Sequence, residues 1–213
     1  MSDARARILA RVRAAQRTGF VPIAQPFRAA DTEAGLKACA TDELLARFLR
    51  ELTAIGVEPF VEPTAEGVRA RVAQLVGDSA VLRWDADCLP YGAGDRLAHA
   101  ADGASPRDVQ AAAVFGVTGC DAAIAETGSL ALITGRGKPR AASLLPPTHI
   151  AIVRPDQLRQ TMGEFFRERA AELAVAANCT FVTGPSRTAD IELTLTLGVH
   201  GPGRVVVIIG PEE

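Results

Sequence analysis

The chain has 213 residues, of which 48% are hydrophobic and 23% charged, and this composition suits one soluble α/β domain with a full apolar core. Its formal net charge of −2 provides no basic field for nucleic acid. No apolar run approaches the ~20 residues of a membrane helix, and the arginine-rich start lacks the apolar segment of a signal peptide, so we expect a cytoplasmic protein without membrane insertion.

The first hundred residues predict helices that alternate with short strands. Apolar residues recur among the arginines of residues 2–17, which predicts an amphipathic helix, and residues 18–40 contain the Pro and Gly residues of a linker. We therefore divide the chain into an N-terminal helix and linker at 1–40 and an α/β domain at 41–213. Within that domain we expect helices that start at Thr41 and Thr64, strands at 57–61 and 80–84, and an irregular excursion at 85–108.

Apolar, strand-like runs and loops of small and polar residues alternate in the second half of the chain. The runs at 149–153 and 205–209 contain no polar alternation, as expected of strands that are covered on both faces. Together with the repeated order of helix and strand, they predict an α/β fold with a mostly parallel sheet and helices on both faces. The other elements that we expect are strands at 111–117, 130–134, 142–145, 180–183 and 191–197, a helical turn at 122–125, and a helix at 156–176.

Two polar runs, residues 116–129 and 184–192, follow predicted strands and form the candidate site. Open α/β sheets bind ligands at the carboxyl ends of neighbouring strands. We therefore expect residues 118–129 and 184–192 to meet in space around a small anionic ligand. The candidate ligand-binding residues are Thr118, Asp121, Thr127, Gly128, Ser129, Ser186, Arg187, Thr188, Glu192 and His200.

The acidic residues of these runs supply the candidate catalytic groups, Glu126 and Asp190. A carboxylate at Glu126 can act as a nucleophile or base, or can bond backbone amides at a turn. Asp190 and Glu192 would share one face of a strand, where mutual repulsion raises the pKa of one of them. Arg187 can clamp a carboxylate of a ligand or pair with one of these acids.

Three further side chains in the polar runs have two interpretations each. Asp121 can contact a ligand or cap a helix. His200 lies in a turn of Gly and Pro, where it can shuttle protons or serve as a hydrogen-bonded structural group. Cys120 can be a small buried side chain or a reactive thiol. The sequence leaves these alternatives open.

The sequence contains no recognisable cofactor or metal site. The four cysteines, Cys39, Cys88, Cys120 and Cys179, are scattered, whereas iron–sulfur and structural zinc sites need clustered ligands. Three isolated histidines do not make a metal site, and residues 135–138 lack the Ser or Thr of a P-loop. No flavin or nicotinamide fingerprint is visible, so we expect no cofactor and no electron carrier in this chain.

Three segments of the chain resemble motifs of the LUD-domain family. They are residues 117–128, 145–150 and 184–192, the last followed by a Gly-Val-His-Gly-Pro motif at 198–202. Ser129 stands where threonine is common in the family, a change that keeps the hydroxyl. The resemblance implies a fold similar to sugar-phosphate isomerases and CoA transferases, and a role beside two iron–sulfur proteins in oxidising L-lactate to pyruvate. The likeness to CoA transferases, whose glutamate accepts an acyl group, favours a nucleophilic Glu126.

The function implied by this resemblance is that of a cluster-free subunit that works with iron–sulfur protein partners. Two alternatives stay open: a stand-alone acyl-transfer or isomerase-type enzyme that uses Glu126, and a binding module that senses a small carboxylate. Turnover by the purified chain alone would favour the enzyme. A co-purifying iron–sulfur protein would favour the subunit, and ligand binding without turnover would favour the sensor.

Overall fold

The computed structural model describes residues 2–18, 40–97, 99–189 and 195–212. The chain divides into two compact units, Met1–Ala38 and Cys39–Glu213. In the first unit, α1 (Ser2–Thr18) confirms the helix that the arginine-rich start predicts. The predicted linker lies almost entirely outside the described residues. None of the described helices is long and apolar enough to cross a membrane.

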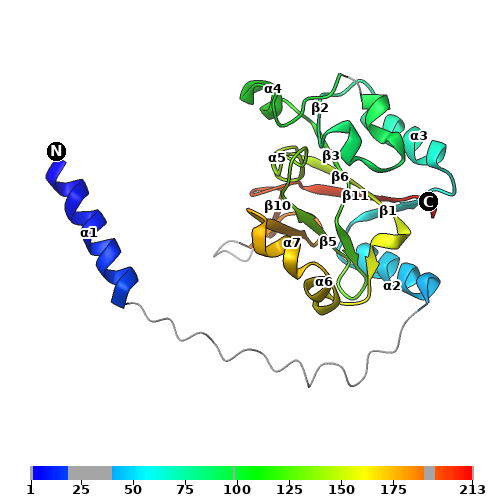
Figure 1. Cartoon of the computed structure of the whole chain (residues 1–213). Coiled ribbons are helices and arrows are strands. Elements are labelled where there is room, and N and C mark those ends of the chain that lie inside the picture. The colour runs from blue at the N-terminus through cyan, green and yellow to red at the C-terminus, as the bar shows by residue number, and fades with distance from the viewer. Residues whose placement is uncertain (1, 19–39, 98, 190–194, 213) are drawn as a thin grey trace. The chain divides into compact units, whose positions relative to one another are not determined.

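Five parallel strands form the central sheet of the second unit, in the order β1-β11-β6-β3-β2 (Figure 1). The α/β fold with a mostly parallel sheet is therefore confirmed. Every side chain of β6 is buried, and so are those of β11 after Arg204, which explains the absence of polar alternation in both runs. The strands are β1 (Glu58–Val61), β2 (Val81–Arg83), β3 (Phe115–Thr118), β6 (Thr148–Val153) and β11 (Arg204–Ile209).

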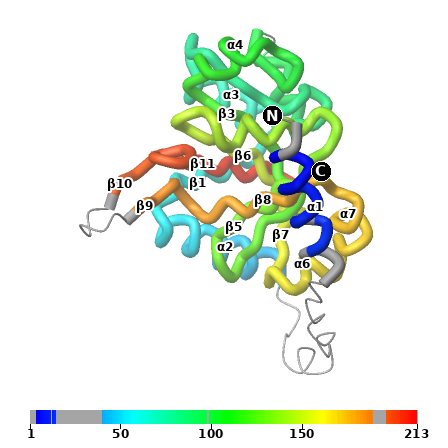
Figure 2. Tube along the Cα trace, turned by 90° about the vertical axis from the view of Figure 1, so that its left-hand side faces the viewer, coloured from blue at the N-terminus to red at the C-terminus, as the bar shows by residue number. Residues whose placement is uncertain are grey.

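Two helices cover β11 from different sides, α3 above it and α2 below it in both views (Figures 1 and 2). Phe48 and Leu52 of α2 are fully buried at a spacing of four residues. Val68, Val72 and Val76 form the corresponding buried stripe of α3. These stripes confirm the two helices predicted from apolar periodicity. Their bounds are α2 (Thr41–Ala54) and α3 (Ala65–Val76).

A second sheet of four strands, in the order β7-β4-β5-β8, packs against the central sheet and is absent from the sequence prediction. Successive side chains along its strands pack into two different apolar clusters, one on each face of the sheet. Ala123 and Leu130 belong to the main core, whereas Ile124 and Ala131 pack with Phe165 on the other face. The second sheet thereby links the main core to the helical segment that contains Phe165. The strands are β4 (Ala122–Ile124), β5 (Ser129–Ile133), β7 (Leu158–Arg159) and β8 (Cys179–Val182).

The helical turn predicted at 122–125 is wrong, because these residues form β4 and pair with β5 and β7. A short apolar run fits a buried strand and a buried helix equally well. The helix predicted at 156–176 is also interrupted, since the pairing of β7 with β4 replaces its first part. The segments found there are η4 (Pro155–Gln157), β7, α6 (Met162–Glu168) and α7 (Ala170–Val175).

The strand predicted at 142–145 is a helix, α5 (Ala141–Leu144). This helix lies so close to β3 that a Cβ atom on Gly116 would stand 1.7 Å from the carbonyl oxygen of Ala142. The strand predicted at 111–117 begins only at Phe115, because α4 (Arg107–Ala111) precedes it. Long-range packing at Gly116 decides this region, and the local apolar pattern does not reveal it.

The excursion predicted at 85–108 contains two 3₁₀ segments, η2 (Ala86–Cys88) and η3 (Pro90–Leu97), before α4. The backbone of Tyr91 adopts φ 59°, a left-handed conformation that is unusual for a residue with a Cβ atom. Its hydroxyl donates to the carbonyl of Pro211 at 2.7 Å, which ties the excursion to the C-terminal end of β11. A small hairpin of β9 (Arg187–Ala189) and β10 (Leu195–Leu197) follows β8.

Candidate functional site

The structure places the predicted site residues in two regions. Thr118 and Asp121 lie at the carboxyl end of β3, where the amide of Asp121 donates to the carbonyl of Ala131 at 2.8 Å. Thr127 to Ser129 lie at the opposite end of the hairpin formed by β4 and β5. At about 3.4 Å per strand residue, the two regions are separated by on the order of 10 Å. They are therefore two candidate sites.

The turn after β4 meets Thr183, the residue just before the second predicted loop at 184–192. The hydroxyl groups of Ser129 and Thr183 are 2.7 Å apart, and Thr127 donates to Ser129 at 2.8 Å. Arg187 extends a guanidinium nitrogen (Nη2) to the carbonyl of Ile55, at the end of α2, at 2.6 Å. We call Thr127, Ser129, Thr183 and Arg187 the turn cluster. Its hydroxyl groups bond one another, and its arginine bonds the backbone.

Gly128 completes the turn cluster through its backbone. Its φ of +66° is left-handed, and a Cβ atom there would lie 3.0 Å from the backbone of α2 at Glu51 and Leu52. Glycine is therefore required both by the turn conformation and by the close approach of α2. The position fits a structural role for this segment.

The other described members of the second predicted loop lie along the β9–β10 hairpin. Ser186 donates its amide to the carbonyl of Pro202 at 2.8 Å and accepts the amide of Gly198 at 2.9 Å. Thr188 pairs with Thr196 between the two strands. His200 is exposed. Asp190 and Glu192 lie outside the described residues.

The carboxylate of Glu126 accepts the amide of Met162, the first residue of α6, at 2.8 Å. The first amides of a helix have no partner within the helix, so a carboxylate at this position stabilises the helix start. This contact is the turn-bonding role that the sequence left open as an alternative. The catalytic role of Glu126 stays a prediction.

A cleft of about 370 Å³ lies at the carboxyl ends of three neighbouring strands of the central sheet, β2, β3 and β6. This is the edge at which open α/β sheets bind ligands. Its walls are residues 84 and 87–91 after β2, residues 119–121 after β3, and Arg154 and Gln157 after β6, and Lys138 and Arg169 complete it. Of the predicted site residues, Asp121 lines this cleft, whereas none of the described residues of the second predicted loop does.

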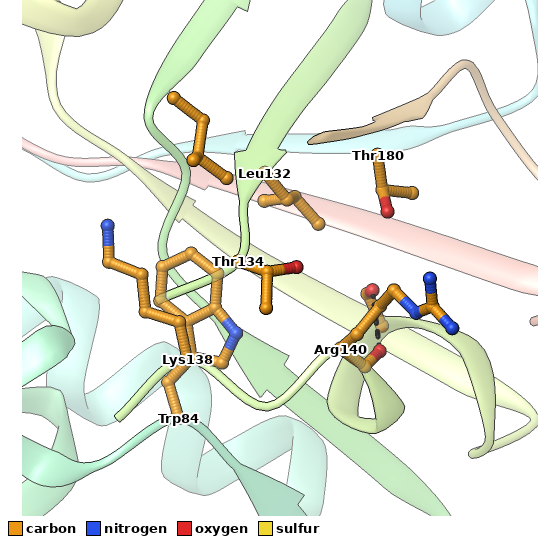
Figure 3. A pocket seen from close by; sticks show the side chains of 8 residues that line it. Trp84, Leu132, Thr134, Lys138, Arg140 and Thr180 are labelled. Carbon is orange, nitrogen blue, oxygen red and sulfur yellow. Dashed lines mark hydrogen bonds between the residues drawn. The ribbon is translucent and has the colours of Figure 1, made fainter. Parts of the chain in front are cut away.

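Asp121 and Lys138 form the central charged pair of this cleft. The nearly buried carboxylate of Asp121 accepts the Lys138 ammonium at 2.5 Å through Oδ1 and the amide of Ile133 at 2.6 Å through Oδ2. The ammonium lies 5.1 Å from the centre of the Trp84 ring, and Figure 3 shows the two side chains side by side. Both carboxylate oxygens of Asp121 already have partners within the chain, so Asp121 has the role of positioning Lys138. Lys138 in turn lines the cleft.

Gln157 holds the floor of the cleft together. Its side-chain amide donates to the carbonyl of Cys120 at 2.7 Å, and its oxygen accepts the amide of Arg154 at 2.9 Å. Burial raises the pKa of the Cys120 thiol, so this group stays protonated near neutral pH. Cys120 therefore fits the role of a small buried side chain.

Thr118 lies inside the sheet rather than on the surface of the cleft. It is fully buried, and its hydroxyl shares a hydrogen bond of 2.9 Å with Nε2 of His149, which is also fully buried. Desolvation lowers the pKa of His149 to about 4, so the ring is neutral at physiological pH. Its Nδ1 has no hydrogen-bond partner among the described residues. The Thr118–His149 pair therefore has a structural role inside the sheet.

Two other hollows are less suited to a ligand. A cavity of about 10 Å³, which shares Trp84 and Lys138 with the cleft and also borders Arg140, has room for about one water molecule (Figure 3). A hollow of about 740 Å³ lies between α3 and η3, at the amino end of β2. Arg96 in that hollow pairs with Glu66, and amino ends of parallel strands are not the usual ligand edge.

Sequence reasoning missed the cations of the cleft, Lys138, Arg154 and Arg169. One signal was available, because Lys138 and Lys37 are the only lysines in a chain with 23 basic residues. Nothing in their spacing indicates that the three converge.

Among the residues that the structure describes, no group of three or more His, Cys, Asp or Glu side chains is arranged to hold a metal ion.

Comparisons with known proteins identify the family. The LUD domain matches residues 45–209. Lactate utilization protein C of Macrococcus caseolyticus is 32% identical over 182 residues, which cover 79% of this chain and 78% of that protein. Lactate utilization protein C of a Geobacillus species is 31% identical over 189 residues, with the same coverage of 79% and 78%. A crystal structure of a DUF162 family protein from Deinococcus radiodurans has a TM-score of 0.64 at 25% identity and covers 81% of this chain and 99% of that chain. The chain belongs to the LUD-domain family.

Proposed function

We propose that this chain takes part in lactate utilization, as the cluster-free subunit of a cytoplasmic system that oxidises L-lactate to pyruvate. The observation that carries the proposal is the similarity to proteins named Lactate utilization protein C, at 32% and 31% identity over 79% of the chain in two cases. The likeness extends across both sheets, since the family match runs from residue 45 to residue 209.

Iron–sulfur proteins are the partners in this proposal. Oxidation of L-lactate to pyruvate removes two electrons and two protons, and carboxylates and hydroxyl groups do not store electrons. The cysteines of this chain are scattered along the sequence, whereas iron–sulfur clusters need grouped thiolates. The electrons from lactate therefore pass to cluster-bearing partner proteins, and this chain contributes a binding or positioning role.

Growth on defined carbon sources tests the proposal. Deletion of the gene in its source organism is expected to abolish growth on L-lactate and to leave growth on pyruvate and glucose normal. Reintroduction of the full chain is expected to restore growth on L-lactate. A deletion strain that grows normally on L-lactate, with no second LUD-domain gene to replace the first, contradicts the proposed role.

Partnership is tested separately by purification of the tagged full chain from lactate-grown cells without oxygen. We expect iron-containing proteins to co-purify, and the reconstituted mixture to reduce an artificial electron acceptor with L-lactate. The chain purified alone is expected to be colourless and inactive in that assay. Lactate oxidation by the chain alone would contradict the subunit role and favour a stand-alone enzyme.

A further inference from the structure

We propose that the cleft at the carboxyl ends of β2, β3 and β6 binds a small organic anion through Lys138, Arg154 and Arg169. The proposed function gives the choice of L-lactate and pyruvate as probes, and the inference rests on it to that extent. The site itself is inferred from the charge, shape and rigidity of the cleft. It differs from the anion site expected around Arg187, because the turn cluster lies at the other end of the β4–β5 hairpin.

Three cationic side chains converge on the cleft, beside the acids Asp87 and Asp121. Each cation has an acidic partner: Lys138 pairs with Asp121, Arg154 with Asp156 and Arg169 with Glu172. The attraction for an anion therefore comes from the convergence of these N–H donors on one hollow, and not from an excess of positive charge. The cations are partly shielded from solvent, with Lys138 25% exposed and Arg169 38% exposed. Partial burial lowers the effective dielectric constant and strengthens their attraction for an anion.

Arg169 retains hydrogen-bonding capacity beyond its protein contacts. Arg169 donates to Glu172 at 3.0 Å through one terminal nitrogen, and its other terminal nitrogen lies 3.4 Å from the carbonyl oxygen of Asp121. A guanidinium group carries five N–H donors, so these two contacts leave donors for a ligand. Planar guanidinium groups bind carboxylate and phosphate oxygens in pairs. Arg169 can therefore hold an anion without losing its own position.

The walls of the cleft are fixed before any ligand binds. The turn that carries Lys138 is tied to the excursion by a bond of 2.8 Å from the amide of Asp85 to the carbonyl of Gly137. The left-handed Tyr91 is held at both ends, because its carbonyl accepts Arg69 at 2.7 Å and its hydroxyl reaches Pro211. Unusual backbone conformations that the surrounding structure holds in place concentrate at ligand sites.

The size of the cleft indicates the class of ligand. A volume of about 370 Å³ falls at the lower end of the range of roughly 300–1,000 Å³ for small-molecule sites. The accessible lining of the cleft is mostly polar, and Trp84, Leu89 and Pro90 contribute its smaller apolar part beside the cations. The site is therefore suited to a small molecule that combines an anionic group with a short carbon skeleton. A carboxylate and a phosphate share the chemistry that these cations recognise.

Intrinsic fluorescence provides a direct test, because Trp84 is the only tryptophan of the chain and lines the cleft. The full chain is titrated with sodium L-lactate, sodium pyruvate and inorganic phosphate at constant ionic strength, with sodium chloride as the blank. We expect at least one of these anions to change the Trp84 emission in a saturable way. Saturation by lactate or pyruvate assigns a carboxylate ligand, and saturation by phosphate alone assigns a phosphorylated one.

Two variants locate the binding. Lys138→Met and Arg169→Gln remove one cation each, and each is expected to raise Kd at least tenfold, the equivalent of about 1.4 kcal/mol. Arg204→Gln is the matched control, because Arg204 pairs with Glu58 on the surface and does not line the cleft. Its Kd is expected to equal that of the unmodified chain. Lys138→Met leaves Asp121 without its cation, so Arg169→Gln keeps the test valid if the first variant unfolds.

Three results would overturn the inference: no saturable response to any of the three anions, an unchanged Kd in Arg169→Gln, or an equal loss of affinity in Arg204→Gln. These failures are distinguishable from failure of the proposed function. A deletion strain that cannot grow on L-lactate, together with a cleft that binds no anion, retains the role in lactate utilization and rejects the site.

Discussion

The cleft and the turn cluster both contain polar residues that follow strands, and arginine occurs in both, but they use their polar groups differently. Around the cleft, Lys138, Arg154 and Arg169 converge from three segments on one hollow. In the turn cluster, Ser129 bonds Thr183, and Arg187 bonds the backbone at the end of α2. Polar residues after a strand thus serve either to bind a ligand or to join elements of the fold. For arginine, which occurs in both regions, the partners of the side chain in the folded chain distinguish the two uses, and the residue type does not.

The Asp121–Lys138 pair gives the largest expected effect on stability. Asp121→Ala leaves the half-buried ammonium of Lys138 and the amide of Ile133 without their shared partner. Loss of one member of a largely buried ion pair lowers the free energy of unfolding by roughly 3 kcal/mol. Urea unfolding of the full chain measures this loss. Glu58→Ala is the control, because its pair with Arg204 is exposed and is worth at most about 1 kcal/mol. Equal losses in the two variants would show that Asp121 is not the anchor of the cleft.

His149, beneath the cleft, predicts how stability depends on pH. Its folded pKa is lowered to about 4, whereas the unfolded chain binds the proton near pH 6.5. Between these values the unfolded state carries more protons, so stability falls as the pH drops from about 6.5 towards 4. The total change is on the order of 3 kcal/mol, since one pKa unit corresponds to about 1.4 kcal/mol.

The pH dependence is measured by urea unfolding at pH values between 7 and 4. His149→Gln removes the titrating ring, and its stability is expected to vary less across the same window. Substitution of the exposed histidines at 99 and 200 provides the controls for loss of an imidazole elsewhere in the chain. A slope that persists in His149→Gln would assign the effect to other groups.

The parts of the fold that local pattern determines were predictable. The buried runs of β6 and β11 and the apolar stripes of α2 and α3 follow directly from residue spacing. The second sheet was not predictable, because the alanine-rich residues of β4 fit a helix as well as a strand. The close packing of α5 on Gly116 is equally invisible in the sequence, since it depends on a contact between distant segments.

The candidate site was predictable in the same limited way. The general rule for α/β sheets pointed to the loop after β3, and Asp121 lies there. Lys138 and Arg169 lie 17 and 48 positions further along the chain, as shown by their contacts with Asp121. Only the crossings between strands bring them to the same edge. No periodicity in the sequence predicts that Lys138 and Arg169 lie close to Asp121.

Glu126 tests whether an acid near the turn cluster is structural or catalytic. Glu126→Gln keeps an oxygen that can accept the Met162 amide, so we expect unfolding stability to change by less than about 0.5 kcal/mol. Glu126→Ala removes the acceptor and is expected to cost about 1 kcal/mol. Growth of the two variants on L-lactate then separates the roles. Loss of growth with a stable Gln variant supports catalysis, whereas growth that follows stability supports capping alone.

The hydroxyl network of the turn cluster has an expected effect of similar size. Ser129→Ala removes the oxygen that joins Thr127 and Thr183, and a typical hydrogen bond contributes about 1 kcal/mol to stability. Anion binding in the cleft is expected to be unchanged, because the network lies at the far end of the hairpin. The two measurements are a urea unfolding curve and a Trp84 titration. A tenfold change in Kd would join the two regions into one site.

The same substitution at two arginines gives the most direct comparison. Arg187→Gln removes one exposed hydrogen bond to Ile55, so the expected change in stability is within about 0.5 kcal/mol and Kd for the anion stays the same. Arg169→Gln removes the same charge from the cleft and is expected to raise Kd for the anion at least tenfold. Ionic strength is held constant, so that the loss of one positive charge from the whole chain affects both variants alike. Suppose instead that Arg187→Gln weakens binding of the anion and Arg169→Gln does not. The ligand then binds at the turn cluster, and the convergence of cations after β2, β3 and β6 has a structural role only.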